Sequence, residues 1–520
     1  MPDDGARHKY PQWMHRLGMV RCRIALPTSQ LICELRKRSV SLYGLGGLVV
    51  VAALLFTLTP APRQWIGCRF SDDPCPSGLT RVTANGRTEY VGVTDSYPFR
   101  PDLGHAMNVL RRQNATATAA KYVTVALAGP LATDEPRTLH RVEGAIAGQY
   151  AANHGGVVGG LPRIRLVLAN MDGQERYWSP VSNRLREMVY GDAHLRAVAG
   201  MGLSQAETVN AMGVLRGAHV ATVGDMTTAD TINEDTQPGF ARVSPDTGQQ
   251  LDVLGDYLRP RLAHHKAMLV AYSKPTDLYT SALKTDFEKY LGGPWRAGGN
   301  VVTPFGEHPD NEFPQIVSVL CGTRGIDTVY YAGRAADLPL FLTYLDHRLG
   351  CSPGKIRVVT TSDTSRLLVR TPANQRAWAA LRDRKRPIEL IYTPLADPRF
   401  LADRPDNRMA GLRTLFDRLG FKRADLDTGW AITEYDAVLT AAQAIRRAAG
   451  DNGDIPPAQN VAEQLRLMNA PTTAVPGASG AIRLDPKTGD RYDLRIPVLR
   501  FVPGEPSEVL TKGGLRPSDP

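Results

Sequence analysis

Residues Tyr122–Ala128 read YVTVALA, and residues Arg137–His154 read RTLHRVEGAIAGQYAANH. The first stretch is a short apolar run rich in β-branched residues, which is typical of a buried strand. The second stretch has the period of an amphipathic helix, and Gly155-Gly156 ends it. The apolar positions that share one face of this helix are Leu139, Val142, Ile146 and Tyr150. A strand followed by such a helix predicts one unit of an α/β fold.

The same alternation continues towards the C-terminus in two successive sets. Further strands are expected at 163–169, 195–199, 219–223, 267–272, 300–303, 328–332, 356–360 and 388–392. Helices are expected at 182–190, 205–216, 248–258, 278–291, 313–321, 338–349, 373–382, 407–419, 430–449 and 461–467. Strands that alternate with helices predict parallel sheets covered on both faces. We therefore predict an α/β protein with two doubly wound, parallel-sheet lobes.

Composition and charge limit the class of protein. Of the 520 residues, 42% are hydrophobic and 22% are charged, which excludes a mostly disordered, collagen-like or many-spanning membrane protein. The net charge of +10 could indicate a polyanionic partner or an anionic membrane surface. Half of this excess, however, lies in residues 1–39, where eight basic and three acidic residues give +5. The charge is therefore mainly a signal of membrane topology.

An uncharged apolar run follows this basic tail. Val40–Thr59 (VSLYGLGGLVVVAALLFTLT) has 20 residues, about the length that a helix needs to cross a bilayer. We predict a cytoplasmic tail at 1–39, a transmembrane anchor at 40–59 and an extracellular remainder, which makes a single-pass protein of the cell membrane. The alternatives are a buried core helix, a cleaved signal peptide that starts at Met19, and a lipoprotein modified at Cys68.

Cysteine usage is consistent with that topology. Two cysteines lie in the tail and four lie outside, and an even number in an oxidising compartment favours disulfides. Local pairing, Cys68 with Cys75 and Cys321 with Cys351, is preferred among the three possible connectivities. A zinc site is the alternative, but the C-x-x-C spacing that it needs is absent. The two cysteines of the tail are Cys22 and Cys33.

Residues 60–120 are interpreted as an extracellular stalk with a small adapter. Residues 80–94 predict a hairpin that turns at Asn85-Gly86, and residues 101–119 predict a helix. We interpret this segment as a spacer between the membrane and the main domain. Residues 507–520 are expected to form a flexible tail.

Motifs that would carry catalysis or bind a cofactor are absent. The sequence has no G-x-S-x-G, no phosphate-binding P-loop, and no G-x-G-x-x-G after its first strand. His264-His265 is interpreted as a solvated helix end, because no carboxylate or cysteine lies at metal-ligand spacing. Basic residues outside the tail are scattered, which disfavours nucleic-acid binding. We predict a protein that is not an enzyme and has no cofactor and no metal.

Polar residues do follow several of the predicted strands, where ligands of parallel sheets bind. Hydroxyl groups and free backbone N–H groups at helix starts suit a carboxylate, and a carboxylate such as Asp363 suits an ammonium group. Helix capping is the alternative for Ser204 and Thr228, and a surface ion pair is the alternative for Arg334 and Asp363. The candidate ligand-binding residues are Ser204, Met226, Thr227, Thr228, Tyr279, Arg334 and Asp363.

Residues 121–506 resemble the type I periplasmic binding proteins, and in particular the receptors for branched-chain amino acids. The stretches that carry this resemblance are VTVALAGPLA, EGAIAGQYAANHGGVVGG, RLVLANMDG, AVAGMGLSQAET, VATVGDMTTADTI, GFARVSPD, AMLVAYSKPTDLYTSAL, DTVYYAGRAAD, EYDAVLTAAQAIRRA and SGAIRLDPKTGDR. A chain of this layout, with an anchor before the domain, is similar to actinobacterial proteins.

The resemblance implies two lobes that are joined by three crossovers and close on a small solute. Lobe one would comprise 121–243 and 364–475, and lobe two would comprise 244–363 and 476–506.

Roles for the candidate residues also follow from this family. The resemblance implies that Ser204 and Thr228 bind a ligand carboxylate, that Tyr279 packs on the ligand, and that Asp363 receives its ammonium group. Two residues depart from the family pattern. Arg334 stands where the amino-acid receptors often have an uncharged or aromatic residue, and Met226 replaces a smaller residue.

The leading hypothesis is therefore a membrane-anchored receptor for a small polar solute that resembles an amino acid. It would serve ABC-type uptake through a permease, or a sensor, and closure of its lobes would be the functional event. A structural or partner-binding module of the cell envelope is the alternative, with a cleft that Trp178 or Met226 plugs. A hydrolase or other enzyme that uses Ser204 or an acidic residue is disfavoured, because no base lies at a recognisable spacing.

Overall fold

The computed structural model describes residues 78–512, except for 85–86, 134, 263–265, 291–299, 350, 352–353, 404–407 and 493. The predicted tail and anchor helix and most of the stalk lie outside the described residues, as do Cys22, Cys33, Cys68 and Cys75. Within the described part, no helix combines the length and the apolar composition that crossing a bilayer requires.

Lobe one is built on a seven-stranded sheet that is parallel at its centre. Apolar strands such as β3, which is buried along nearly its whole length, form its middle. Its strands, in spatial order, are β1 (Leu79–Ala84), β2 (Arg87–Thr94), β4 (Arg163–Asn170), β3 (Tyr122–Gly129), β5 (Leu195–Ala199), β6 (Ala221–Gly224) and β7 (Phe240–Arg242).

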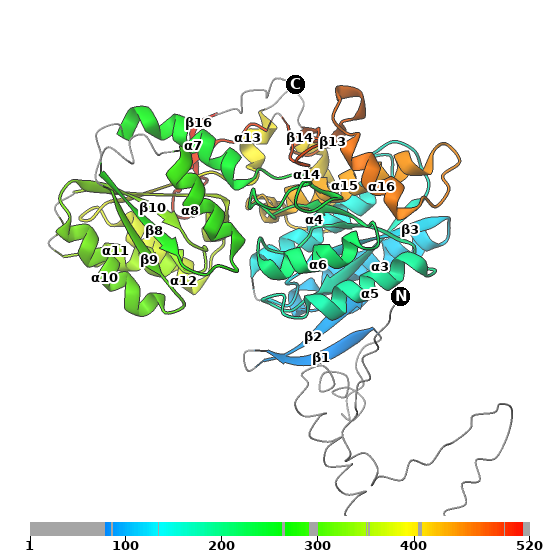
Figure 1. The fold of residues 1–520 in the computed structure, drawn as a ribbon, viewed down its shortest axis with the longest axis horizontal. Coiled ribbons are helices and arrows are strands. Elements are labelled where there is room, and N and C mark those ends of the chain that lie inside the picture. The colour runs from blue at the N-terminus through cyan, green and yellow to red at the C-terminus, as the bar shows by residue number, and fades with distance from the viewer. Residues whose placement is uncertain are drawn as a thin grey trace, which may run out of the picture. The chain divides into compact units, whose positions relative to one another are not determined.

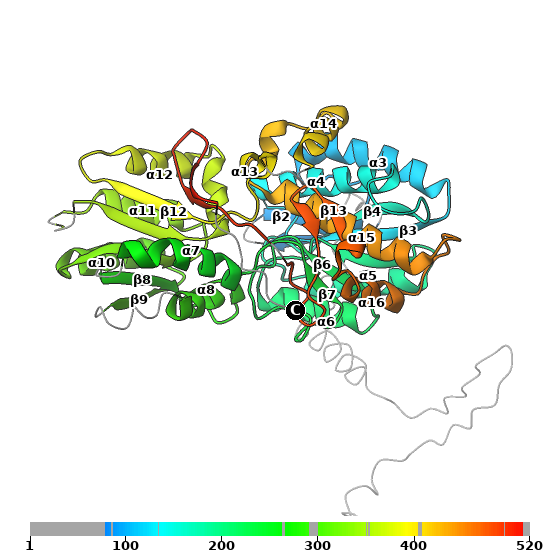
Figure 2. The same cartoon turned by 90° about the horizontal axis from the view of Figure 1, so that it is seen from above.

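Helices cover both faces of this sheet, as Figure 2 shows. On one side lie α3 (Gly104–Thr118), α4 (Pro136–Asn153), α14 (Met409–Leu419) and α15 (Trp430–Ala449), and on the other lie α5 (Trp178–Tyr190) and α6 (Ala206–Arg216). The lobe also holds η2 (Pro101–Leu103), η4 (Arg423–Leu426), α16 (Ala458–Arg466), η5 (Pro471–Thr473), β13 (Val475–Gly477) and β14 (Gly480–Ile482).

Lobe two has a second seven-stranded sheet, and Figure 1 shows it beside lobe one. Its strands, in spatial order, are β16 (Glu508–Thr511), β15 (Val498–Arg500), β12 (Ile388–Tyr392), β11 (Ile356–Thr360), β10 (Ile326–Ala332), β8 (Lys266–Tyr272) and β9 (Val301–Phe305). One face carries α7 (Thr247–Leu262) and α8 (Leu278–Tyr290), and the other carries α10 (Pro309–Gly322), α11 (Leu338–Asp346) and α12 (Pro372–Arg382). The predicted α/β class with two doubly wound lobes is confirmed.

The chain crosses between the lobes at 243–246, 393–397 and 483–497. The second crossing differs from the predicted boundary at residue 364. Strand β12 pairs with β11 in parallel, so α12 and β12 belong to lobe two, and the chain returns to lobe one only at α13 (Pro398–Ala402). The third crossing also lies later than residue 476, because β13 and β14 pack against lobe one.

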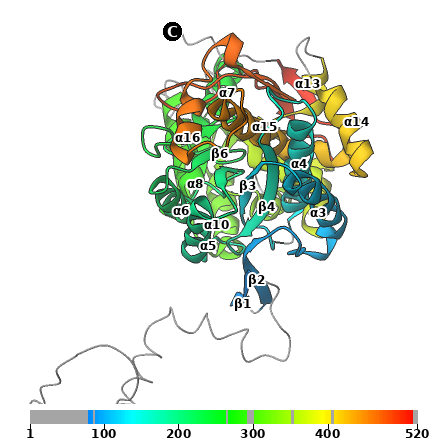
Figure 3. The ribbon, with the colours of Figure 1, turned by 90° about the vertical axis from the view of Figure 1, so that its right-hand side faces the viewer.

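Residues 79–118 are part of lobe one and not a spacer. The hairpin of β1 and β2 forms as predicted, but β2 also pairs with β4 and extends the sheet at its edge, which Figure 3 shows. Helix α3 packs on the same sheet, where the side-chain amide of Asn114 donates to the carbonyl of Leu166 at 2.8 Å. The sequence predicts a spacer here because the segment is rich in polar residues, but many of its apolar residues are buried.

The C-terminal segment is likewise more ordered than expected. Residues 508–511, for which the sequence predicts a flexible tail, form β16 and pair antiparallel with β15. In lobe two, Cys321 and Cys351 form a disulfide, which is the pairing preferred from the sequence. It ties the end of α10 to the segment before β11, so it closes a loop of 30 residues.

Candidate functional site

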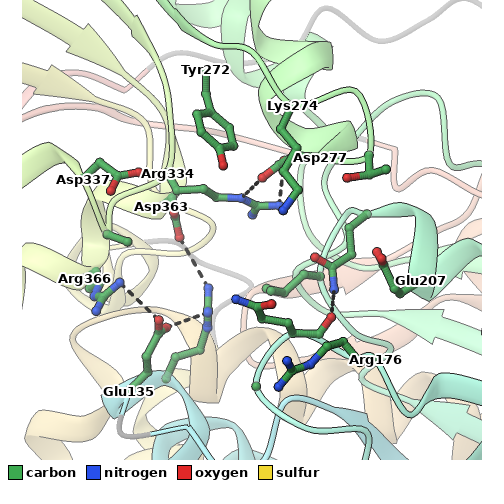
Figure 4. Close-up of a pocket in the computed structure, with 17 residues that line it drawn as sticks. Glu135, Arg176, Glu207, Tyr272, Lys274, Asp277, Arg334, Asp337, Asp363 and Arg366 are labelled. Atoms are coloured by element: carbon green, nitrogen blue, oxygen red, sulfur yellow. Dashed lines mark hydrogen bonds and ion pairs between the residues drawn. The ribbon is translucent and has the colours of Figure 1, made fainter. Parts of the chain in front are cut away.

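A polar cavity of about 290 Å³ lies between the two lobes, at the carboxyl ends of the strands. The side chains from lobe one follow β3, β4 and β5, and those from lobe two follow β8, β10 and β11. Its charged lining residues are Glu135, Arg137, Arg176, Glu207, Lys274, Asp277, Arg334, Asp337, Asp363 and Arg366. Side chains from both lobes therefore line one small cavity (Figure 4).

Arg334 marks the inner end of this cavity, because its side chain is 18% exposed, against 42% for Arg176 at the outer end. Its guanidinium group binds the carboxylate of Asp277 through two hydrogen bonds, of 2.8 Å from Nε and 2.9 Å from Nη2. Nη2 also donates to the carbonyl of Ser204 in lobe one, at 3.2 Å. Burial opposes the charge of Arg334, but Asp277 and Asp363 raise its pKa above the usual value, so the group stays protonated.

Ion pairs cross the cleft next to Arg334. Arg366 in lobe two contacts Glu135 in lobe one at 3.1 Å, and Arg137 in lobe one contacts Asp363 in lobe two at 3.5 Å. Arg137 is also 2.6 Å from Glu135. The four side chains form a chain of alternating charge, which Figure 4 shows in part. They are half-buried or nearly buried, so these contacts are screened less than surface pairs.

Backbone hydrogen bonds also join the lobes. The amide of Ala206 donates to the carbonyl of Thr276 at 3.0 Å, and the amide of Tyr279 donates to the carbonyl of Ser204 at 3.1 Å. The loop before α6 therefore contacts the loop before α8 directly. Such contacts can form only when the lobes are closed on each other, so this structure is a closed conformation.

Buried carboxylates hold the lobe-one loops in place. Glu175 accepts a hydrogen bond from the amide of Leu203 at 2.7 Å and another from the hydroxyl of Thr208. Arg141 of α4 binds Asp225, which follows β6, through hydrogen bonds of 2.6 and 3.0 Å. Because these groups are fully buried, the loops that they bind are fixed in position.

Of the seven candidate ligand-binding residues, Arg334 and Asp363 line the cavity. The other five are buried and do not belong to the described lining of the cavity. The hydroxyl of Ser204 accepts a hydrogen bond from the amide of Ala229, and that of Thr227 donates to the carbonyls of Met201 and Gly202.

Tyr279, Thr228 and Met226 are engaged within the protein as well. The hydroxyl of Tyr279 is 2.8 Å from that of Thr361, and burial raises the pKa of this phenol. The carbonyl of Thr228 accepts a hydrogen bond from the amide of Thr247 at 2.7 Å, across the first crossover.

The two suggested plugs are not at the cavity. Met226 packs with Leu395 and Trp430 in a small apolar cluster. Trp178, the first residue of α5, packs against the core of lobe one. The side chain that reaches across the inner end of the cleft is instead Arg334.

Sequence reasoning did not include most of the lining residues. Lys274 and Asp277 follow β8, and Asp337 follows β10, so the rule of strand ends points to their loops but not to their orientation. Burial raises the pKa of Asp337 to about 6, with Arg366 opposing and Asp363 adding to the rise. Arg137 and Arg176 follow β3 and β4, where the same rule could have been applied.

Solved structures with the same fold are numerous. A substrate-binding protein of an ABC transporter from Desulfitobacterium hafniense, in complex with Leu, is 18% identical with a TM-score of 0.57, covering 75% of this chain and 100% of that one. The leucine-binding protein LivK from Thermotoga maritima is 17% identical with a TM-score of 0.57, covering 75% and 98%. A solute-binding protein from Rhodopseudomonas palustris, in complex with 3,4-dihydroxybenzoic acid, is 16% identical with a TM-score of 0.54, covering 75% and 96%.

These identities establish similarity of fold, and the family assignment comes from the sequence itself. A comparison with curated proteins gives no match. Residues 123–491, however, match the family described as periplasmic binding protein, which accounts for most of the chain. The two sheets, the three crossovers and the cavity between the lobes agree with this match. The chain belongs to the periplasmic binding protein family.

Proposed function

We propose that this protein is an anchored extracellular receptor that closes its two lobes on a small, polar, zwitterionic solute, for ABC-type uptake or for sensing. The observation that carries this function is the cavity between the lobes, whose lining comes from both of them. A solute in this position stabilises the closed state, because it contacts both lobes only when they are together. No catalytic step is involved.

The composition of the cavity supports the class of solute. Among the described lining residues, five are cationic and five are acidic, so the lining is close to neutral but highly polar. Such a lining favours a solute that carries both a positive and a negative group over an aliphatic or a strongly anionic one. A volume of about 290 Å³ limits this solute to a small molecule such as an amino acid or an analogue.

Attachment to the membrane is part of the proposal and is supported by the sequence. The 20 uncharged residues of Val40–Thr59 have the length of a spanning helix, and the basic tail before them favours a cytoplasmic N-terminus. A permease or a sensor in the same membrane would then be the partner that recognises the closed form.

The test is a thermal-shift measurement on the full chain, recovered with detergent from the membrane fraction, against amino acids, amides, peptides, sugars and organic anions. A zwitterionic solute should raise Tm by mass action. Arg176→Ala, which alters the cavity, should reduce this shift. Arg184→Ala on α5, which lies outside the described lining, should leave it unchanged.

A ligand-free structural module is the second candidate function. It is favoured by the fact that the hydroxyl groups of Ser204, Thr227 and Tyr279 are hydrogen-bonded to other groups of the protein rather than exposed to the cavity. If no compound shifts Tm, or if Arg176→Ala and Arg184→Ala have the same effect on the shift, the receptor function is wrong.

A further inference from the structure

Three groups surround the guanidinium of Arg334 at the inner end of the cleft. Asp277 supplies a carboxylate that accepts two hydrogen bonds, and Ser204 supplies a backbone carbonyl from the other lobe. The ring of Tyr279 lies under the guanidinium, with its centroid 4.7 Å from the Cζ atom. A carboxylate, a carbonyl and the face of an aromatic ring are together a binding site for an organic cation.

The groups that surround Arg334 are held in place by contacts that do not involve the arginine. Tyr279 is 2% exposed and Ser204 is 1% exposed, and the hydroxyl of Tyr279 is held by Thr361. Asp277 is 9% exposed, and its Oδ1 also accepts a hydrogen bond from the amide of Thr280 at the start of α8. The three groups that bind the cation are therefore held in place by contacts of their own.

The position of the site matters as much as its chemistry. Asp277 and Tyr279 belong to lobe two, whereas the carbonyl of Ser204 belongs to lobe one. A cation bound here contacts both lobes, as a solute would. Arg334 itself comes from lobe two, so it makes the contact to lobe one without any solute.

We propose that Arg334 is a resident occupant of the cleft: its guanidinium group fills a cation site at the inner end, bridges the lobes in the absence of solute, and confines the solute to the outer cavity. The last of these three roles rests on the proposed function. With the inner end filled, the solute is recognised by outer residues such as Arg176 and Asp337. The inner site would take a small guanidinium or ammonium compound only when Arg334 is removed.

The test uses the full chain with Arg334→Ala and methylguanidinium as the probe. The variant should have a lower Tm than the wild type, and methylguanidinium should restore it in a saturable manner. At ten times the Kd, mass action gives a rise of roughly 1–2 °C for a two-lobe domain of this size. In the wild type the same compound should give no rise, because the site is filled.

Two further variants separate this effect from a general action of the compound. Arg261→Ala removes an arginine that is stacked on Tyr257 at 4.0 Å on the surface, and methylguanidinium should not raise its Tm. The double variant Arg334→Ala/Asp277→Asn lacks the carboxylate of the site, so the rise should be lost. An equal response of all the variants, or no response of Arg334→Ala, overturns the inference.

The test also covers a variant that does not fold and a receptor function that fails. If Arg334→Ala does not fold by itself, the yield of soluble protein with and without methylguanidinium in the refolding buffer replaces Tm, and a yield that does not respond overturns the inference. Failure here is also distinct from failure of the receptor function, because the solute screen uses the wild type and the rescue requires no natural solute. Solute binding by the wild type, without rescue of Arg334→Ala, would retain the receptor and reject the resident cation.

Discussion

Glu143 on α4 links the burial of one carboxyl group to the pH dependence of stability. Burial, followed by the neighbouring Asp425, raises the pKa of Glu143 to about 9, and Lys422 only partly opposes this rise. Each of the two carboxyl groups buries an oxygen without a hydrogen-bond partner unless one group is protonated and donates to the other. His140 contacts Asp425 at 3.3 Å and favours its charged form, so Glu143 carries the shared proton.

The substitution Glu143→Gln tests this proton. The folded state binds it more tightly than the unfolded state does, so the wild type loses stability as the pH rises from about 4.5 towards about 9. A glutamine amide donates to Asp425 without a proton to lose. Relative to the wild type, the variant should gain up to about 1.4 kcal/mol per pH unit in this window.

Denaturant unfolding of both proteins at pH 5 and at pH 8 provides the measurement. The free energy of unfolding should differ little at pH 5, and the variant should be the more stable protein at pH 8. A difference that is the same at both pH values would show that Glu143 is ionised throughout.

The candidate site also shows what can be predicted at the scale of single residues. Arg334 and Asp363 were found from their positions after strands, because the ends of parallel strands converge in any sheet of this kind. Ser204 and Tyr279 follow strands too, yet their side chains are buried in the protein and do not line the cavity. Their direction depends on contacts with the opposite lobe, such as the bond between the amide of Tyr279 and the carbonyl of Ser204. A pattern along one chain contains no information on such contacts.

At the scale of elements, α4 and α15 pack closely against each other in lobe one. Two glycines, one helical turn apart on α4, allow it. A Cβ atom on Gly144 would lie 2.3 Å from the carbonyl oxygen of Ala431, and one on Gly148 would lie 2.8 Å from the Cβ of Val438. The backbone of α15 therefore approaches α4 more closely than any side chain would permit.

We expect Gly144→Ala to destabilise the protein by about 1–3 kcal/mol or more, because the neighbouring atom belongs to a helix backbone that cannot move alone. Gly213→Ala on α6 is the matched control, since a Cβ there meets no atom within 4 Å. It should be neutral or stabilise by up to about 1 kcal/mol, as alanine favours the helix. Urea unfolding of both variants measures the difference, and equal effects would refute the close approach.

The elements themselves were largely predictable. The helical period of Arg137–His154 and the apolar run of Tyr122–Ala128 correspond to α4 and β3, and each end agrees within one residue. These segments are long and strongly periodic, so the local pattern and the final fold agree. The glycines of α4, in contrast, lower helix propensity, and their reason appears only with the partner helix in place.

At the scale of the whole molecule, the division into lobes was the less predictable part. The strand β12 looks like any other apolar strand, and its assignment to lobe two follows from its pairing with β11. Residues 79–118 were expected to be a spacer, because they precede the regular alternation and are rich in polar residues. Their pairing with β4 and their packing on α4 are long-range contacts, which composition does not reveal.

Leu110 on α3 provides the test of this organisation, since it is fully buried in the core of lobe one. If residues 79–118 are part of the lobe, Leu110→Ala should cost about 2–5 kcal/mol of unfolding free energy, through lost apolar contacts and a residual cavity. Leu349→Ala is the control, because Leu349 is 84% exposed, and its effect should stay within about 0.5 kcal/mol. A spacer that does not pack on the lobe would make the two substitutions equally harmless.

A single unfolding transition that moves to lower denaturant with Leu110→Ala would instead show that the hairpin, α3 and the sheet unfold as one unit.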